Sequence, residues 1–133
     1  MKVIREIILF GLVGALGFLI DSGVLYLLKD CIGLYTGRAV SFICAVVLTW
    51  FLNRSFTFKQ EKRARNLILE FTHYFMLMLI GGCFNIGVYY IMVHQSEFVN
   101  SFPIIGVAVG SIVGMFVNFI SSRVMFYSKG EKR

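Results

Sequence analysis

The chain has 133 residues and a formal net charge of +6; 58% of its residues are hydrophobic and only 15% are charged. A water-soluble domain of this size needs about 25% charged residues, so the composition excludes an ordinary soluble protein and favours one covered by lipid. The basic residues lie between long apolar runs rather than along one face, which argues against nucleic acid as a partner. The cysteines have neither metal-site nor disulfide spacing, and no metal or cofactor is expected: Cys31, Cys44 and Cys83.

A membrane-spanning helix needs about 20 mostly apolar residues, and four segments meet this requirement, at about 7–28, 36–53, 71–93 and 102–122. The second is the weakest because it carries Arg38 near its start. Lys2 and Arg5 precede the first run as in a signal peptide, but the run is too long and no small-x-small cleavage site follows it. The pattern predicts an all-α membrane protein with four transmembrane helices in one domain, 1–133.

The distribution of lysine and arginine predicts the orientation of these helices. Eleven of the 13 lie at the N-terminus, in the segment between the second and third helices, or at the C-terminus. Only Lys29 and Arg38 lie in the two short hairpin connections. Because cytoplasmic loops are enriched in Lys and Arg, we predict that both termini and the middle segment are cytoplasmic.

The two halves of the sequence repeat one another. Shifting the first helix by 64 positions places Glu6 on Glu70, Gly17 on Gly81 and Asp21 on Asn85. Shifting the second by 69 places Asn53-Arg54 on Ser122-Arg123. Both repeats, at about 6–58 and 70–127, start on the same side of the membrane, so they are predicted to be parallel helix-hairpin repeats related by an axis along the membrane normal.

Small and polar residues recur every four positions, which places them on one face of each helix. The second helix carries Gly37, Ser41, Ala45, Thr49 and Asn53 in this register. The fourth carries Gly106, Gly110, Gly114, Asn118 and Ser122. Small residues let helices approach closely in lipid, so we predict packing seams, with Gly14 and Gly17 contributing from the first helix.

Asp21 lies 14 residues past Ile7, or about 21 Å along the helix, which places it in the outer half of the bilayer. A carboxylate at the helix centre costs at least about 2.5–3.5 kcal/mol on insertion scales. Two interpretations stay open. The residue is either a neutral carboxyl hydrogen-bonded to a neighbouring helix, or a cavity-facing group that binds a polar headgroup.

Arg54 and Arg123 end the second and fourth helices at the predicted inner interface. A guanidinium fork suits a phosphate, although snorkelling to the interface, with Glu6 or Glu70 as partner, explains the pair equally. The aromatic residues that follow are expected to be interfacial belt residues: Phe56, Phe58, Phe126 and Tyr127. The sequence contains no nucleotide-binding, zinc-protease or nucleophile-elbow motif, so an enzyme is not expected.

The chain resembles the GtrA-like family of small four-helix membrane proteins over about 10–127. The resemblance rests on Val13-Gly14, on Asp21, on the run Asn53-Arg54-Ser-Phe-Thr-Phe58, and on its second copy, Asn118-Phe119 with Arg123 and Tyr127. The chain departs from the family pattern at Thr49 and Ser122, where asparagine is common, and at Tyr127, where phenylalanine is usual. Identical ligand binding by both halves is therefore not implied.

The resemblance implies a flippase that moves a polyprenyl-phosphate-linked sugar across the bacterial cytoplasmic membrane, for O-antigen, teichoic-acid or other cell-surface polysaccharide glycosylation. On this hypothesis Arg54 and Arg123, with Asn53 and Asn118, hold the phosphate, while Asp21 and Asn85 bind sugar hydroxyls. The implied partners are membrane glycosyltransferases, and a homo-oligomer is expected. Two alternatives remain: a non-transporting scaffold for a glycosyltransferase, or a small multidrug-type proton-coupled exporter that uses Asp21.

Overall fold

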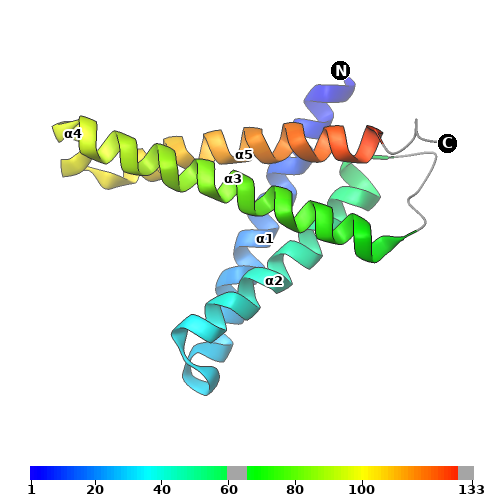
Figure 1. Cartoon of the computed structure of the whole chain (residues 1–133), viewed down its shortest axis with the longest axis horizontal. Helices are drawn as coiled ribbons and strands as arrows, with labels where there is room; N and C mark the ends of the chain where they lie inside the picture. Colours follow the sequence, from blue (N-terminus) through cyan, green and yellow to red (C-terminus); the bar gives the residue numbers. More distant parts are fainter. Residues whose placement is uncertain (60–65, 129–133) are drawn as a thin grey trace. The chain divides into compact units, whose positions relative to one another are not determined.

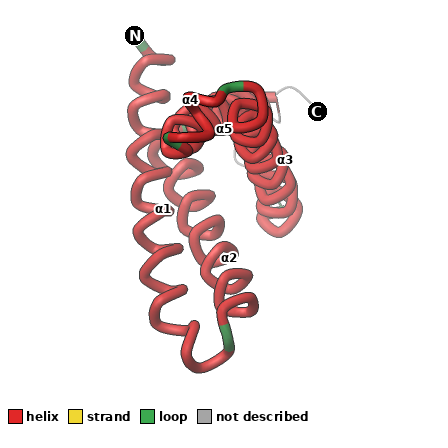
Figure 2. The backbone as a smooth tube through the Cα atoms, turned by 90° about the vertical axis from the view of Figure 1, so that its left-hand side faces the viewer, coloured by secondary structure: helices red, strands yellow, loops and turns green. Residues whose placement is uncertain are grey.

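The computed structural model describes residues 1–59 and 66–128, and these residues form helices and no strand (Figure 2). The chain divides into two compact units, one of described residues up to Leu67 and one from Ile68 on. Six basic residues counted in the orientation argument lie outside the described residues: Lys62, Arg63, Arg65, Lys129, Lys132 and Arg133. The elements in chain order are α1 (Lys2–Ile32), α2 (Leu34–Leu52), the π-helical turn η1 (Asn53–Thr57), α3 (Leu67–Gln95), α4 (Glu97–Ser101) and α5 (Pro103–Ser128) (Figure 1).

Unit 1 is a helical hairpin of α1 and α2, extended at its far end by η1. A single residue, Gly33, joins the two helices with a φ of 85°. This left-handed conformation is open to glycine without a steric penalty, so the chain reverses direction at one residue. Apolar side chains from both helices and the residue after η1 fill the interior, namely Phe10, Val13, Ala45, Val46 and Phe58.

Unit 2 pairs α3 with α5 and inserts the short helix α4 between them. The Ser96 hydroxyl accepts a hydrogen bond from the Val99 backbone N–H at 3.3 Å and so caps α4. Pro103 is the first residue of α5, where its missing N–H costs nothing and its fixed φ suits a helix. The buried apolar residues of this unit are Tyr74, Val99, Phe119, Met125 and Phe126.

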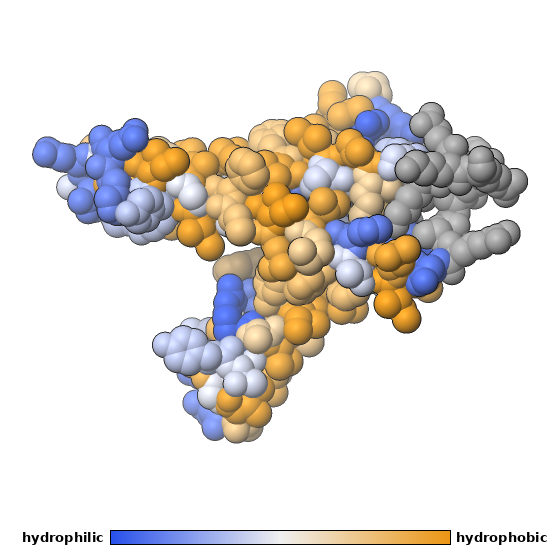
Figure 3. All heavy atoms as spheres, in the orientation of Figure 1, coloured by the Kyte–Doolittle hydropathy of each residue, from blue (hydrophilic) through white to orange (hydrophobic). Residues whose placement is uncertain are grey.

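Four helices are long and apolar enough to cross a membrane: Lys2–Ile32, Leu34–Thr57, Leu67–Gln95 and Pro103–Ser128. Their outward faces carry large apolar side chains, for example Ile8, Leu12, Leu16 and Leu19 on α1. On the face seen in Figure 3, apolar residues follow the helix shafts and hydrophilic ones gather near helix ends. The protein is therefore an all-α, multi-pass membrane protein, as the sequence predicts.

The helices extend beyond the apolar runs. The 31 residues of α1 span about 46 Å at 1.5 Å per residue, longer than a hydrocarbon core of about 30 Å. Apolarity marks only the part of a helix that lies in hydrocarbon, whereas backbone hydrogen bonding continues the helix through charged residues at both ends. The connection expected at about 29–35 is accordingly reduced to Gly33.

Candidate functional site

Equivalent small-residue contacts hold each helix pair together. In unit 1, Gly17 faces Thr49, and a Cβ atom at Gly17 would lie 2.6 Å from the Thr49 Cγ2 atom. In unit 2, a Cβ atom at Gly81 would overlap the Asn118 amide. These two pairs correspond under the sequence shifts of 64 and 69 positions. The internal repeat is therefore also a repeat of three-dimensional contacts.

Four of the five glycines expected to pack lie in these seams, and one does not. Gly17, Gly106, Gly110 and Gly114 are buried. Gly14 is exposed, and a Cβ atom there would meet nothing within 4 Å. The buried row on α1 instead runs through Glu6, Phe10, Val13 and Gly17, so Gly14 is turned away from α2.

Asp21 is paired within unit 1. Its Oδ2 atom lies 2.6 Å from Nη1 of Arg38, and its Oδ1 atom accepts a hydrogen bond of 2.6 Å from the Ser41 hydroxyl. The Asp21 side chain is 14% exposed, whereas that of Arg38 is 58% exposed. The Ser41 hydroxyl also lies 3.0 Å from the Arg38 carbonyl oxygen. These three residues are called the ionic cluster below.

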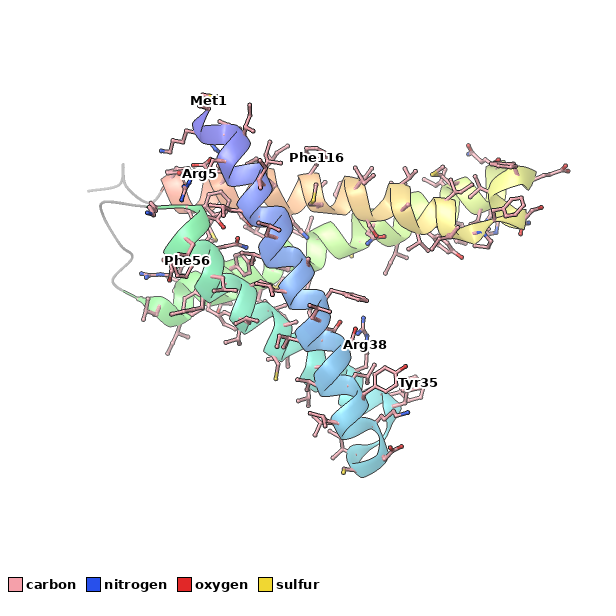
Figure 4. The ribbon with its side chains drawn as sticks, turned by 180° about the vertical axis from the view of Figure 1, so that it is seen from behind. Met1, Arg5, Tyr35, Arg38, Phe56 and Phe116 are labelled. Atoms are coloured by element: carbon pink, nitrogen blue, oxygen red, sulfur yellow. The ribbon has the colours of Figure 1, made fainter. Side chains whose placement is uncertain are left out.

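The ionic cluster was missed in the sequence because Arg38 counted only as a charge of the hairpin connection. Since α2 begins at Leu34, Arg38 lies inside a helix, and Ser41 follows it by three residues on the same face. Figure 4 shows Arg38 and Tyr35 towards the Gly33 end of the hairpin, and Arg5 and Phe56 towards its other end. The one available signal was a helical spacing that placed Arg38 within reach of the only acid of the first apolar run.

Unit 2 has no counterpart of the ionic cluster. The positions equivalent to Asp21, Arg38 and Ser41 are Asn85, Val107 and Gly110. Asn85 lies directly against the α5 backbone. A Cβ atom at Gly110 would lie 2.5 Å from the Asn85 carbonyl oxygen, and one at Gly114 would lie 3.0 Å from the Asn85 Cβ atom. Close packing replaces the charged contact.

The two arginines predicted as phosphate ligands occupy matching places. Arg54 comes five residues after Thr49, and Arg123 five residues after Asn118, the two residues that contact the seam glycines. Both side chains are partly exposed, and both take part in interactions within the chain. Arg123 also lies over the Tyr127 ring, with its Cζ atom 5.0 Å from the centroid, which is cation–π geometry.

The polar residues beside these arginines point inward. Asn53 is 1% exposed, and its Oδ1 atom accepts a hydrogen bond of 2.8 Å from the Thr57 hydroxyl. In unit 2, the Asn118 Oδ1 and Ser122 Oγ atoms are buried without a hydrogen-bond partner among the described residues. The structure therefore places Asn53 in the interior of its unit rather than beside a headgroup. Glu6 and Glu70 are equally buried, and neither lacks a partner.

The π-helical turn corrects the predicted alignment of the repeat at its end. In η1 the Phe58 N–H bonds to the Asn53 carbonyl oxygen at 2.8 Å, so five residues occupy a turn that four occupy in an α-helix. Phe58 then meets Phe10, with ring centroids 6.1 Å apart, just as Phe126 meets Tyr74 at 6.1 Å. The partner of Phe58 in the second repeat is therefore Phe126 and not Tyr127.

The same geometry shows that two of the four expected belt aromatics are core residues. Phe58 is 0% exposed and Phe126 is 1% exposed, whereas Phe56 is 55% exposed and Tyr127 is partly exposed. The error arose because an α-helical register was assumed through 53–58, where the extra residue of the π turn rotates every later side chain by about 100°. π turns are frequent at functional sites, and this one contains Arg54.

Comparison with known proteins identifies the family. No curated protein and no solved structure matches the chain. Residues 9–127 match the family described as GtrA/DPMS, transmembrane domain. The match covers both helix pairs and includes the ionic cluster and both candidate arginines. This chain therefore belongs to the GtrA/DPMS transmembrane domain family.

Proposed function

We propose that this protein moves a polyprenyl-phosphate-linked sugar across the bacterial cytoplasmic membrane for cell-surface glycosylation. Family membership supports the handling of such lipids, and four membrane-crossing helices support a path for a headgroup. The observation that carries the proposal is the matched position of Arg54 and Arg123. Each lies at the corresponding end of one helix pair, five residues beyond the small-residue seam contact.

The two arginines serve as the phosphate ligands of this proposal. A guanidinium keeps its charge at physiological pH and can donate two parallel hydrogen bonds to phosphate oxygens. A partly exposed guanidinium at a helix end can reach a headgroup without dragging the phosphate into hydrocarbon. In the orientation predicted from the charges, this end faces the cytoplasm, where lipid-linked sugar donors carrying nucleotide-derived sugars are made.

The buried polar residues act behind the arginines. Asn53 binds Thr57 within η1, so we assign it to positioning the turn that carries Arg54. Asn118 holds the equivalent place on α5, against Gly81. Asn85, which is partly exposed, remains the candidate for sugar hydroxyls deeper in the membrane. Both carboxylate oxygens of Asp21 are engaged by Arg38 and Ser41, so Asp21 does not enter this proposal as a sugar ligand.

Transport in this proposal is downhill. The sequence carries no ATP-binding motif, and consumption of the sugar by a membrane glycosyltransferase on the outer face would draw the lipid across. A wall of four helices is thin, so we further propose that copies of the chain associate as a homo-oligomer through small-residue faces. The exposed glycine at position 14 lies on such a face.

The test is transport by purified protein in liposomes. The probes are citronellyl phosphates linked to glucose, mannose or N-acetylglucosamine, whose uptake is measured with time. We expect Arg54→Ala and Arg123→Ala each to lower the uptake rate by about tenfold, because a hydrogen bond to a charged group is worth about 1.5–3 kcal/mol. Arg5→Ala is the matched control, since Arg5 is an exposed arginine of the same helix pair and its loss should leave the rate unchanged.

The same experiment separates the alternatives. Purified protein that moves none of the probes, but restores a glycosyltransferase when the two are combined, would establish the scaffold and reject transport. A proton-coupled exporter needs an acid that is free to exchange protons and cargo. The short ion pair between Asp21 and Arg38 favours the lipid-linked substrate over that reaction.

A further inference from the structure

The ionic cluster combines an acid with no spare oxygen and a base with spare donors. Both oxygens of Asp21 are engaged at 2.6 Å, one by Arg38 and one by Ser41. Arg38 contacts Asp21 through Nη1, and 58% of its side chain is exposed. A guanidinium has five N–H donors in a planar fork, so the exposed part of Arg38 can donate to a further anion while Nη1 stays near Asp21.

Unit 2 shows that the hairpin does not require this ion pair. There the equivalent residues are Asn85, Val107 and Gly110, and the helices meet by direct contact between Asn85 and the Gly110 region. A charged pair between membrane-spanning helices is costly to maintain, and the repeat offers an uncharged solution to the same packing problem. A purely structural role therefore does not account for the presence of the cluster in unit 1.

The position of Arg38 relative to Arg54 fits two ends of one path. They are separated by 16 residues along α2 and η1, or about 24 Å at 1.5 Å per residue. This separation is close to the hydrocarbon thickness of about 30 Å. In the predicted orientation Arg54 lies near the inner leaflet and Arg38 near the outer one.

We propose that Arg38 is a second phosphate ligand, at the outer end of unit 1, and that Asp21 is its exchangeable partner. The phosphate of the lipid binds the exposed side of the guanidinium and weakens the contact with Asp21. The carboxylate, oriented by Ser41, then competes for Arg38 and promotes release of the phosphate. This inference rests on the proposed function for its substrate class, but its test measures binding without transport.

A fluorophore on Cys31 would report binding locally. Cys31 is exposed in the last turn of α1, where neighbouring Lys29 packs on the start of α2, with its Cα atom 3.5 Å from a Cβ atom built at Gly37. Cys44→Ser and Cys83→Ser would leave Cys31 as the single thiol. The purified protein in nanodiscs is then titrated with citronellyl phosphate, and with citronellol as the phosphate-free control.

We expect saturable binding of citronellyl phosphate and none of citronellol. Arg38→Gln should weaken the affinity about tenfold or more, and Arg38→Lys should weaken it less, because an ammonium keeps the charge but lacks the fork. Asp21→Asn should tighten binding severalfold, because the internal competitor is removed. Lys29→Gln, which removes a charge at the same end of the hairpin, should leave the affinity unchanged.

Several outcomes would overturn the inference. Equal weakening by Arg38→Gln and Lys29→Gln would show only diffuse attraction to positive charge. Weaker binding in Asp21→Asn, with helicity retained by circular dichroism, would make the ion pair a structural element. If Arg38→Gln does not fold, Arg38→Lys and Asp21→Asn still decide, since they must change the affinity in opposite directions. Binding at Arg38 with no transport by the wild-type protein would reject the proposed function and keep this site.

Discussion

The two helix pairs of this protein use the same seam and treat its polar positions differently. Each has a glycine on the first helix against a polar residue on the second, Gly17 with Thr49 and Gly81 with Asn118. Unit 1 adds an ion pair and a π turn, whereas unit 2 fills the same places with glycine, valine and continuous α-helix. Close packing is thus the shared element, and charge is the element that only one copy carries. This difference argues that the charged positions serve a purpose other than assembly of the helix pair.

The largest effect is expected from the two buried rings that the π turn aligns. Phe58→Ala and Phe126→Ala should each lower the free energy of unfolding by about 3 kcal/mol, the low end for a buried aromatic residue, because lipid is itself apolar. Unfolding in mixed micelles with increasing dodecyl sulfate measures this. Tyr127→Ala is the control for register. A larger loss from Tyr127→Ala than from Phe126→Ala would restore an α-helical alignment of the repeats.

A substitution at Gly110 tests the close packing of unit 2. Gly110→Ala would place a Cβ atom 2.5 Å from the Asn85 carbonyl oxygen, and this backbone atom can move only with α3. We expect a loss of about 2 kcal/mol, within the range for overpacking. The matched control is Gly87→Ala on α3, where a Cβ atom would meet nothing within 4 Å and where alanine favours the helix. Equal stabilities of the two variants would contradict the seam.

The ion pair tests whether charge contributes to the stability of unit 1. Arg38→Val leaves the Asp21 carboxylate without its cation, and we expect a loss of about 1–2 kcal/mol, reduced from the buried-pair value because Arg38 is exposed. The double variant Asp21→Asn with Arg38→Val copies unit 2 and should recover about half of that loss. A double-mutant cycle measures the coupling. Additive losses would show that the two residues do not interact in the membrane.

The smallest effects separate the paired and unpaired polar residues. Asn53→Ala removes the acceptor of the Thr57 hydroxyl and should cost about 1 kcal/mol. Ser122→Ala, at the equivalent place, removes a hydroxyl without a hydrogen-bond partner among the described residues. Its stability should stay within about 0.5 kcal/mol of the wild type. A marked loss from Ser122→Ala would reveal a partner, such as bound water, on the Oγ atom.

Much of the fold was predictable because lipid imposes a simple rule on sequence. Runs of about 20 apolar residues predicted four helices, and four membrane-crossing helices are present. The four-residue recurrence of small residues predicted the faces that pack, and Gly17, Gly106, Gly110 and Gly114 lie on them. Gly14 shared this spacing only approximately, and the structure turns it outward. The orientation of the termini stays a prediction.

The candidate site was predictable only in part. Arg54 and Arg123 stood out as a repeated pair, and their matched places in the two units agree with that reading. The partner of Asp21 did not stand out, since a helix can pair with its neighbour at several axial offsets and the offset depends on a turn only one residue long. The interior placement of Asn53 and Phe58 was equally hidden, because one extra residue in a π turn changes the face on which every later side chain lies.

The sequence by itself determined the class of protein, the number of helices, the repeat and the family, because hydrophobic length and recurring residue types are properties of the chain alone. The tertiary structure decided which polar groups meet. It joined Asp21 to Arg38 and Ser41, placed Asn53 inside unit 1, and made Phe126 rather than Tyr127 the counterpart of Phe58. These outcomes depend on the axial offset and rotation of one helix against another, which side-chain packing sets.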